Sequence, residues 1–246
     1  HLLQKVTYQV LDQLRKQRTS LGPLQLMTWV KTLQKHGLFV ESIDILFEFS
    51  RQTMVENLPR TFYTHFFPKR FEQDVHASGT PLKLPQALIS AFIRRESLFD
   101  PMATSPAYAI GLMQVLPTTA KLAPAQLADP ETNIKAGSKY LSTLMKNACP
   151  DKTVPRCPNK GLGAQNCILP RNRIDLAKAE GRLDEEYQFV IAAYNGGHCG
   201  ANTESSGCPG KARWECEGEL PETRNYVPRV LRYYSLLKEK KWGCSE

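Results

Sequence analysis

The sequence predicts an all-α protein, with a helical N-terminal region followed by a second helical domain. Apolar residues recur at helical spacing in one segment after another, which is the primary signal of amphipathic helices. Several of these segments open with proline or close with glycine, as helices commonly do. No alternating apolar and polar run of useful length predicts a strand.

The N-terminal third is expected to form helical hairpins. The first helix is predicted over residues 2–18, the second from Pro23 to Gly37, and the third over residues 40–54. Packing an apolar face into a core is the ordinary role of such helices. The stretch 76–85 carries glycine, proline and serine and predicts a boundary. We therefore expect an N-terminal region of residues 1–80 and a second domain of residues 81–246.

A further helix is predicted over residues 84–99, opened by Pro85 and ended by Asp100 and Pro101. Its apolar stripe includes Phe92 and Ile93, and Glu96 follows at the spacing that puts it on the same face. We expect Arg94 and Arg95 to project to the sides of the helix.

Three more helices are predicted, over residues 128–148, 185–197 and 220–241, with Pro228 a kink or turn in the last. Between them lie two stretches rich in glycine, proline and cysteine, residues 147–186 and 198–218. Both adjoin the helix that ends in AYNGG, and both look inserted.

The 246-residue chain is 41% hydrophobic and 23% charged, which is typical of a soluble globular protein. Its net charge of +8 suits an anionic polymer, but no motif for nucleic-acid binding is present. No apolar run approaches the length of a membrane span. The chain begins at His1 instead of methionine, so we expect a trimmed or mature chain whose signal peptide has been removed.

All seven cysteines lie between Cys149 and Cys244, in segments with a loop-like composition. Clustered cysteines indicate disulfides and an oxidising compartment, so we expect a periplasmic or secreted protein. A zinc site at His198, Cys199, Cys208 and Cys216 is the alternative, although its spacing matches no standard zinc motif.

Glu96 is the candidate for acid–base chemistry. A carboxyl group on an apolar helix face loses hydration when ionised, so its pKa rises and it can act as a general acid. The alternative is a structural charge that pairs with Arg94 or Arg95. The segment after Asp100 carries no acid until Asp129, so no second carboxylate follows nearby.

Four ordered motifs resemble those of soluble lytic transglycosylases of the Slt type, family 1. The first is RESLFDPMATSPAYAIGLMQVLPTTA, around Glu96, and the others are NIKAGSKYL, AAYNGG and PETRNYV, within residues 85–235. The resemblance implies a lysozyme-like catalytic domain with little or no sheet. The chain departs from the family at Tyr108, where alanine or glycine is usual, and at Gly196, where alanine is more common.

The resemblance implies that Glu96 is the only catalytic acid/base. It further implies that Ser105 and Tyr194 hydrogen-bond near Glu96, and that Gln114, Asn195 and Glu222 contact the glycan. Each of these residues also has a structural alternative: Tyr194 in the core, Asn195 at a helix C-terminus, Glu222 at a helix N-terminus, and Gln114 bonded to buried backbone.

The implied reaction is cleavage of the bond between N-acetylmuramic acid and N-acetylglucosamine in peptidoglycan. Glu96 would protonate the bond and then take the proton of the C6 hydroxyl, which closes a 1,6-anhydro ring without water. Most glycosidases use two carboxylates, and a hydrolytic lysozyme is therefore the first alternative. A wall-binding module without activity is the second.

We expect no cofactor, no metal, no nucleic-acid partner and a monomer that binds peptidoglycan strands. The insertions are expected to border the glycan groove and to change its specificity, for example towards N-deacetylated strands. Five basic residues without an intervening acid would form a basic lip there: Lys152, Arg156, Lys160, Arg171 and Arg173.

Overall fold

The computed structural model describes residues 22–52, 60–146, 183–197, 205–209 and 211–238, together with Asp12, Lys16, Leu58 and Ala201. These residues form helices joined by loops and include no β-strand; isolated bridges join Thr104 with Ile110 and Ile110 with Val115. The all-α prediction is therefore confirmed. The α-helices are α2 (Pro23–Lys35), α3 (Phe39–Gln52), α4 (Arg60–Phe66), α5 (Glu72–Gly79), α6 (Gln86–Glu96), α7 (Pro117–Ala120), α8 (Pro124–Leu127), α9 (Pro130–Lys146), α11 (Leu183–Gly196) and α13 (Pro221–Lys238), with 3-10 turns η2 (Thr80–Leu82) and η4 (Arg213–Glu215).

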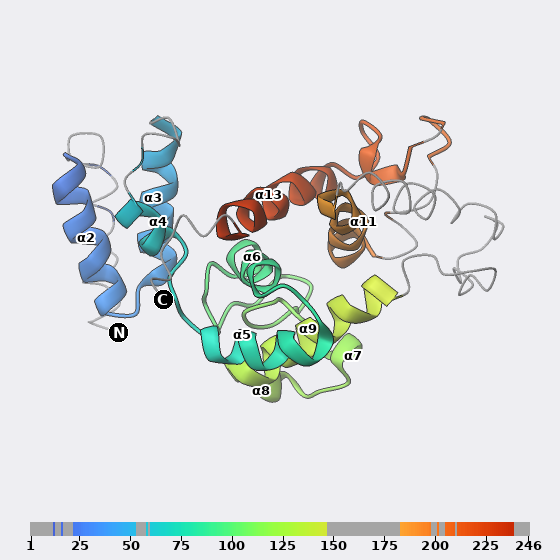
Figure 1. Ribbon diagram of the computed structural model, residues 1–246, viewed down its shortest axis with the longest axis horizontal. Helices are drawn as coiled ribbons and strands as arrows, with labels where there is room; N and C mark the ends of the chain where they lie inside the picture. Colours follow the sequence, from blue (N-terminus) through green and yellow to red (C-terminus); the bar gives the residue numbers. More distant parts are fainter. Residues whose placement is uncertain are drawn as a thin grey trace.

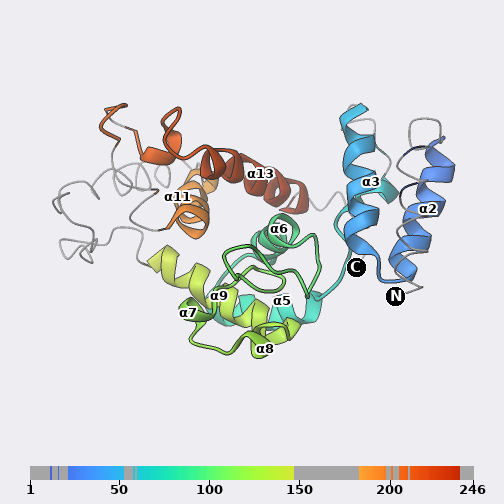
Figure 2. The ribbon, with the colours of Figure 1, turned by 180° about the vertical axis from the view of Figure 1, so that it is seen from behind.

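Helix α6 lies in the middle of the molecule and beneath α13 in both ribbon views, and it also contacts α5 (Figures 1 and 2). Helix α13 packs on α6 and on α11, and α11 also reaches α9. Helices α2, α3 and α4 form a separate group at one end. One cluster of buried apolar side chains continues through both parts.

The expected helices appear close to their predicted bounds, and α4, α5, α7 and α8 were not individually predicted. Pro23 opens α2, and Gly37 follows it in the left-handed conformation at φ 78°. Of the predicted helix over residues 2–18, only Asp12 and Lys16 are described; both are helical, and their side chains form an ion pair of 2.7 Å. Helix α13 continues through Pro228.

Two details of the α6 region differ from the prediction. The helix ends at Glu96, before Asp100, because Leu98 and Phe99 take the left-handed conformation at φ 54° and 65°. Arg94 does not project to the side: it is 2% exposed, and its guanidinium lies over the rings of Phe66 and Tyr233.

The boundary between residues 80 and 81 stays a prediction. Helix α5, which precedes it, packs against α9 and α6, and η2 contacts both α5 and α9. None of the described helices combines the length and the apolar character that a membrane crossing requires.

Candidate active site

Glu96 stands at the last position of α6, at the edge of the core. Phe92 and Ile93, on the same face, are fully buried, whereas Glu96 itself remains partly exposed. Burial raises the pKa of the Glu96 carboxyl to about 7, and the nearby charge of Glu222 raises it further; a hydrogen bond from Tyr226 and the charge of Arg95 oppose this shift. A carboxyl with this pKa carries its proton in a useful fraction of molecules at neutral pH, as a general acid requires.

Tyr226 is the direct partner of Glu96. Its hydroxyl reaches from α13 and donates a hydrogen bond to Glu96 Oε1, although 130 residues separate the two in sequence. Burial and the neighbouring carboxylate hold the pKa of Tyr226 well above its ordinary value, so the hydroxyl keeps its proton. The guanidinium of Arg95 lies 4.9 Å from the centre of the Tyr226 ring. Among the described residues, no ion pair joins Glu96 to Arg94 or Arg95.

Aromatic rings from three helices pack against one another near Glu96. The ring centre of Tyr194, in α11, is 4.7 Å from that of Phe92 in α6 and 5.3 Å from that of Tyr140 in α9. The Tyr194 hydroxyl donates to the backbone oxygen of Met113 at 2.8 Å. Tyr194 therefore connects these aromatic rings to the loop between α6 and α7. The charge of the Glu96 carboxylate reaches Tyr194, but among the described residues no hydrogen bond joins the two side chains.

The loop between α6 and α7 is fixed by bonds to its own backbone. Ser97 Oγ donates to the oxygens of Ile93 (3.1 Å) and Leu112 (2.9 Å), which ties the loop to the end of α6. Gln114, at φ 47°, donates from Nε2 to the oxygens of Ala103 (3.0 Å) and Gly111 (2.9 Å). The amide nitrogen of Gln114 thus bonds to backbone, as the structural alternative expected, whereas its Oε1 has no recorded partner among the described residues.

Ser105 lies farther along the same loop. Its Oγ accepts the N–H of Ala109 at 3.0 Å, and its own N–H donates to the Ala109 oxygen at 2.9 Å. The described residues show no contact between Ser105 and Glu96. The structure therefore gives Ser105 a part in shaping the loop tip. At that tip Tyr108 is 77% exposed, in the left-handed conformation at φ 62°.

Asn195 and Glu222 meet where α11 ends and α13 begins. Asn195 Nδ2 donates to Glu222 Oε1 at 3.4 Å, and Asn195 Oδ1 accepts the hydroxyl of Thr223 at 2.7 Å. The side chain of Asn195 thus bonds to the next helix instead of capping its own. A Cβ at Gly196 would lie 2.7 Å from Thr223 Oγ1, so this bond explains the glycine at that position.

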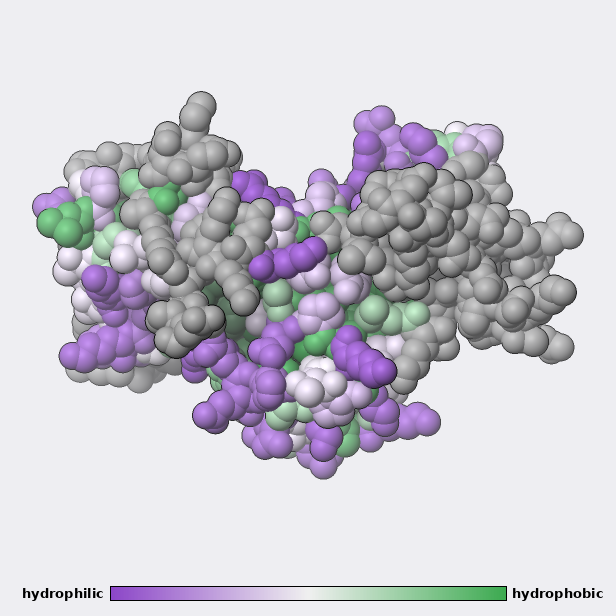
Figure 3. Space-filling view, in the orientation of Figure 1, coloured by the Kyte–Doolittle hydropathy of each residue, from purple (hydrophilic) through white to green (hydrophobic). Residues whose placement is uncertain are grey.

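The structure thus brings together Glu96, Tyr194, Asn195 and Glu222. Gln114 directly follows Met113, whose backbone oxygen accepts the hydrogen bond of Tyr194. On the face seen in Figure 3, hydrophobic and neutral side chains gather in the middle of the molecule, where Figure 1 places α6, with hydrophilic ones above and below.

Sequence reasoning missed two members of this site. Tyr226 belongs to the PETRNYV motif, so its position was marked, but the motif alone gave no reason to pair it with Glu96. Arg94 was assigned to the wrong environment, because a charged residue at a helix end is usually solvated. The aromatic residues Phe66 and Tyr233, which surround it, lie far away in the sequence.

The first two acids that follow Glu96 in sequence have structural roles. Asp100 Oδ1 accepts the N–H of Met102 at 2.9 Å, and Asp129 Oδ2 accepts that of Thr132 at 2.9 Å at the start of α9. Glu222 is the carboxylate whose charge reaches Glu96. Among the described residues, Glu222 is therefore the carboxylate that a two-carboxylate mechanism could pair with Glu96; the side chains of the acids at 184–186 lie outside the described residues.

The described part of the second insertion is cross-linked. Cys208 and Cys216 form a disulfide, which confirms one of the expected bridges and removes both residues from the zinc alternative. Glu219 accepts hydrogen bonds from Ser205 and from Arg213, the latter at 2.6 Å. No group of three or more potential metal ligands occurs in the part of the chain that the structure describes. The five basic residues of the expected lip, and the other five cysteines, lie outside the described residues.

Comparison with known proteins gives one family. The family model described as the transglycosylase SLT domain matches residues 77–215. The soluble lytic murein transglycosylase of Escherichia coli K12 is 41% identical over 165 residues, covering 61% of this chain and 20% of that protein. A putative soluble lytic murein transglycosylase of Haemophilus influenzae is 31% identical over 185 residues, covering 71% of this chain and 26% of the relative.

Solved structures show the same fold. The lytic transglycosylase Slt of Pseudomonas aeruginosa, in an inactive mutant form, superposes with a TM-score of 0.55 at 20% identity, covering 88% of this chain and 30% of that one. The 70-kDa soluble lytic transglycosylase of Escherichia coli gives 0.54 at 22% identity, covering 85% and 29%. The chain thus spans between a fifth and about a quarter of the length of the curated relatives named above.

Proposed function

The chain belongs to the transglycosylase SLT domain family, and from this premise we propose that it is a lytic transglycosylase of peptidoglycan with Glu96 as its one acid/base. The observation that carries the proposal is the environment of Glu96: a largely desolvated carboxyl with a pKa near 7, held by the hydroxyl of Tyr226. The matched relatives are lytic murein transglycosylases, which gives the substrate class.

In the proposed reaction, protonated Glu96 gives its proton to the glycosidic oxygen between N-acetylmuramic acid and N-acetylglucosamine. The C–O bond breaks, the bonding electron pair leaves with the oxygen, and the 2-acetamido group stabilises the positive centre. Ionised Glu96 then accepts the proton of the muramyl C6 hydroxyl while the C6 oxygen bonds to C1 of the same sugar. The attack gains from effective concentration because nucleophile and electrophile share one sugar.

The other residues of the site have supporting roles in this proposal. Tyr226 orients the carboxyl and donates to it in either protonation state. Gln114 Oε1 and the paired Asn195 and Glu222 are the hydrogen-bonding groups offered to the glycan. The expected preference for N-deacetylated strands remains a proposal about the insertions. It concerns only the glucosamine units, because the proposed reaction needs the acetamido group of the cleaved muramyl unit.

The product decides the reaction class. Mass spectrometry of digested peptidoglycan should find 1,6-anhydromuramyl ends, because the ring closes without water. Reducing ends, heavier by the mass of one water, would instead identify a hydrolase on the same fold. Intact peptidoglycan, with the strands merely bound, would support the wall-binding alternative.

A hydrolytic lysozyme stays a second candidate because of Glu222. Its charge reaches Glu96, and its carboxylate could act as the general base if a water fits between it and the substrate. Under the proposed reaction, Glu222→Gln keeps a hydrogen-bond partner for Asn195 and should lower kcat less than about tenfold. A loss of about a hundredfold or more, equal to the loss of a general base, would favour hydrolysis. Initial rates of both proteins on purified sacculi make the comparison.

The pH profile of kcat/KM should have an alkaline limb set by Glu96. Only the protonated acid starts the reaction, so activity is full well below pH 7 and falls as the pH rises through about 7. Tyr226→Phe removes the hydrogen bond that lowers this pKa, so the limb should move to higher pH in the variant. A limb that stays in place, or moves to lower pH, would contradict the assignment of Tyr226 as the partner of Glu96.

A further inference from the structure

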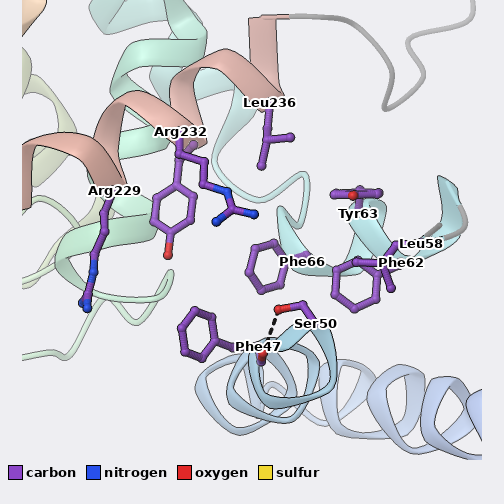
Figure 4. A pocket seen from close by; sticks show the side chains of 10 residues that line it. Phe47, Ser50, Leu58, Phe62, Tyr63, Phe66, Arg229, Arg232 and Leu236 are labelled. Carbon is purple, nitrogen blue, oxygen red and sulfur yellow. Dashed lines mark hydrogen bonds between the residues drawn. The ribbon is translucent and has the colours of Figure 1, made fainter. Parts of the chain in front are cut away.

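A cavity whose lining does not include Glu96 lies where helices α3 and α4 face α13. It has a volume of about 470 Å³, within the range of pockets that hold small ligands. Figure 4 shows side chains from these helices around it, with α3 below, α4 to the right and α13 above. The lining is mostly apolar or aromatic and includes Phe47, Phe62, Phe66 and Tyr233, together with Arg229 and Arg232.

The charged residues recorded in the lining of this pocket are both positive. They are Arg229 and Arg232; no acidic residue lines the pocket among the described residues, and none of the ion pairs recorded there involves either arginine. In Figure 4 the guanidinium of Arg232 extends from α13 towards the middle of the ring of side chains. Guanidinium groups bind carboxylates and phosphates through paired hydrogen bonds, so they favour an anionic ligand.

A third guanidinium lies behind the aromatic wall. Arg94 is 2% exposed, and its charge is 4.4 Å from the ring centre of Phe66 and 5.1 Å from that of Tyr233, two residues that line the pocket. Its Nε has no hydrogen-bond partner. Burial lowers the pKa of Arg94 to about 10, so it keeps its charge at neutral pH, and Asp44 is the acid whose charge reaches it. Its positive potential adds to that of the two lining arginines.

We propose that the pocket between α3, α4 and α13 binds a small amphipathic anion, with its apolar body against Phe47, Phe62 and Phe66 and its carboxylate or phosphate on Arg229 and Arg232. The aromatic walls supply burial for the body, and the arginines, unpaired among the described residues, supply the counter-charge. This inference is independent of the proposed reaction at Glu96.

The pocket shares α13 with the candidate active site. Tyr226, which bonds Glu96, and Tyr233, which lines the pocket, are seven residues apart and thus on one face of the helix, about 10 Å apart along its axis. Arg94 and Glu96 are likewise neighbours on α6. An occupant of the pocket would therefore contact the same two helices that hold the carboxyl.

Calorimetric titration of the whole chain with 2-naphthoate, 2-naphthyl phosphate and neutral 2-naphthamide tests the proposal. We expect saturable binding of at least one anion with a Kd below about 1 mM, and at least tenfold weaker binding of the amide. The tighter of the two anions identifies the preferred head group. Equal binding of all three, or no saturable binding, would overturn the proposal.

Variants locate the binding. The double substitution Arg229→Met and Arg232→Met should weaken anion binding about tenfold or more and leave the amide unchanged. Phe47→Ala, at a residue 42% exposed, should weaken anion and amide alike, because it removes a wall. Lys139→Met, on the exposed face of α9, is the control and should change neither. With melting temperatures confirming folded proteins, anion binding that survives both pocket variants would refute the assignment.

Discussion

Glu96→Gln should lower turnover on peptidoglycan by about a hundredfold or more, because general acid catalysis contributes at least that factor. The amide has the shape of the carboxyl and can accept the hydrogen bond of Tyr226, but it cannot give a proton to the glycosidic oxygen. Release of soluble muropeptides from sacculi, measured at pH 6 where Glu96 is protonated, gives the rate.

The same substitution should stabilise the fold at alkaline pH. The carboxyl pKa is raised from 4.5 to about 7, so the folded chain holds the Glu96 proton more tightly than the unfolded chain does. The free energy of unfolding of the parent therefore falls between pH 4.5 and about 7, and above this window it lacks about 3 kcal/mol. The glutamine variant is free of this loss. Urea unfolding of both proteins at pH 4.5 and pH 8 measures the difference.

Glu131→Gln is the matched control, since Glu131 is an exposed glutamate in the first turn of α9. It should change neither the rate nor the pH dependence of unfolding. If Glu96→Gln kept its rate within about tenfold of the parent, Glu96 would have no role in proton transfer. If it lost activity but gained no stability at pH 8, the carboxyl would be catalytic without being desolvated.

The sequence predicted those features that depend on local periodicity. The helical stripe of Phe92 and Ile93 placed Glu96 at the edge of the core, and proline marked the start of α2, α6 and α13. Local patterns gave no warning at Leu98 and Phe99, because the left-handed conformation that ends α6 is usually occupied by glycine. The helix was therefore predicted to run too far.

The features that depend on distant contacts were not predictable in this way. The bond from Tyr226 to Glu96 requires α13 to pack across α6, and nothing within either segment sets that pairing. The same packing buries Arg94 between Phe66 and Tyr233. Resemblance to a family marked Tyr226, Asn195 and Glu222 as positions, whereas only the fold shows which atoms they present to one another.

Asn133 supports the loop beside Glu96 without taking part in the proposed chemistry. It is 1% exposed in α9 and belongs to the NIKAGSKYL motif. Its Oδ1 accepts the N–H of Met113 at 2.8 Å, and its Nδ2 donates to the oxygens of Ile110 (2.7 Å) and Leu127 (2.8 Å). One amide thus satisfies three backbone groups, and it fits closely, since a Cβ at Gly111 would lie 2.5 Å from Asn133 Nδ2.

Asn133→Ala should therefore lower the free energy of unfolding by about 2 kcal/mol or more, because the buried N–H of Met113 and the buried oxygen of Leu127 lose their partner and each costs about 1–3 kcal/mol. The oxygen of Ile110 keeps the N–H of Val115 as a donor. It should also lower kcat of the folded protein by about tenfold or more, since Met113 carries the oxygen that Tyr194 bonds and Gln114 follows it. Lys135→Ala, exposed on the same helix, is the control and should leave both quantities unchanged. Urea unfolding gives the stability, and rates on sacculi, corrected for the folded fraction, give kcat.

A variant as stable as the control would mean that water or a shifted backbone replaces all three bonds. A variant that is destabilised but keeps its kcat would mean that the position of the loop is set by Ser97 and Tyr194 alone, and that Asn133 contributes only to stability.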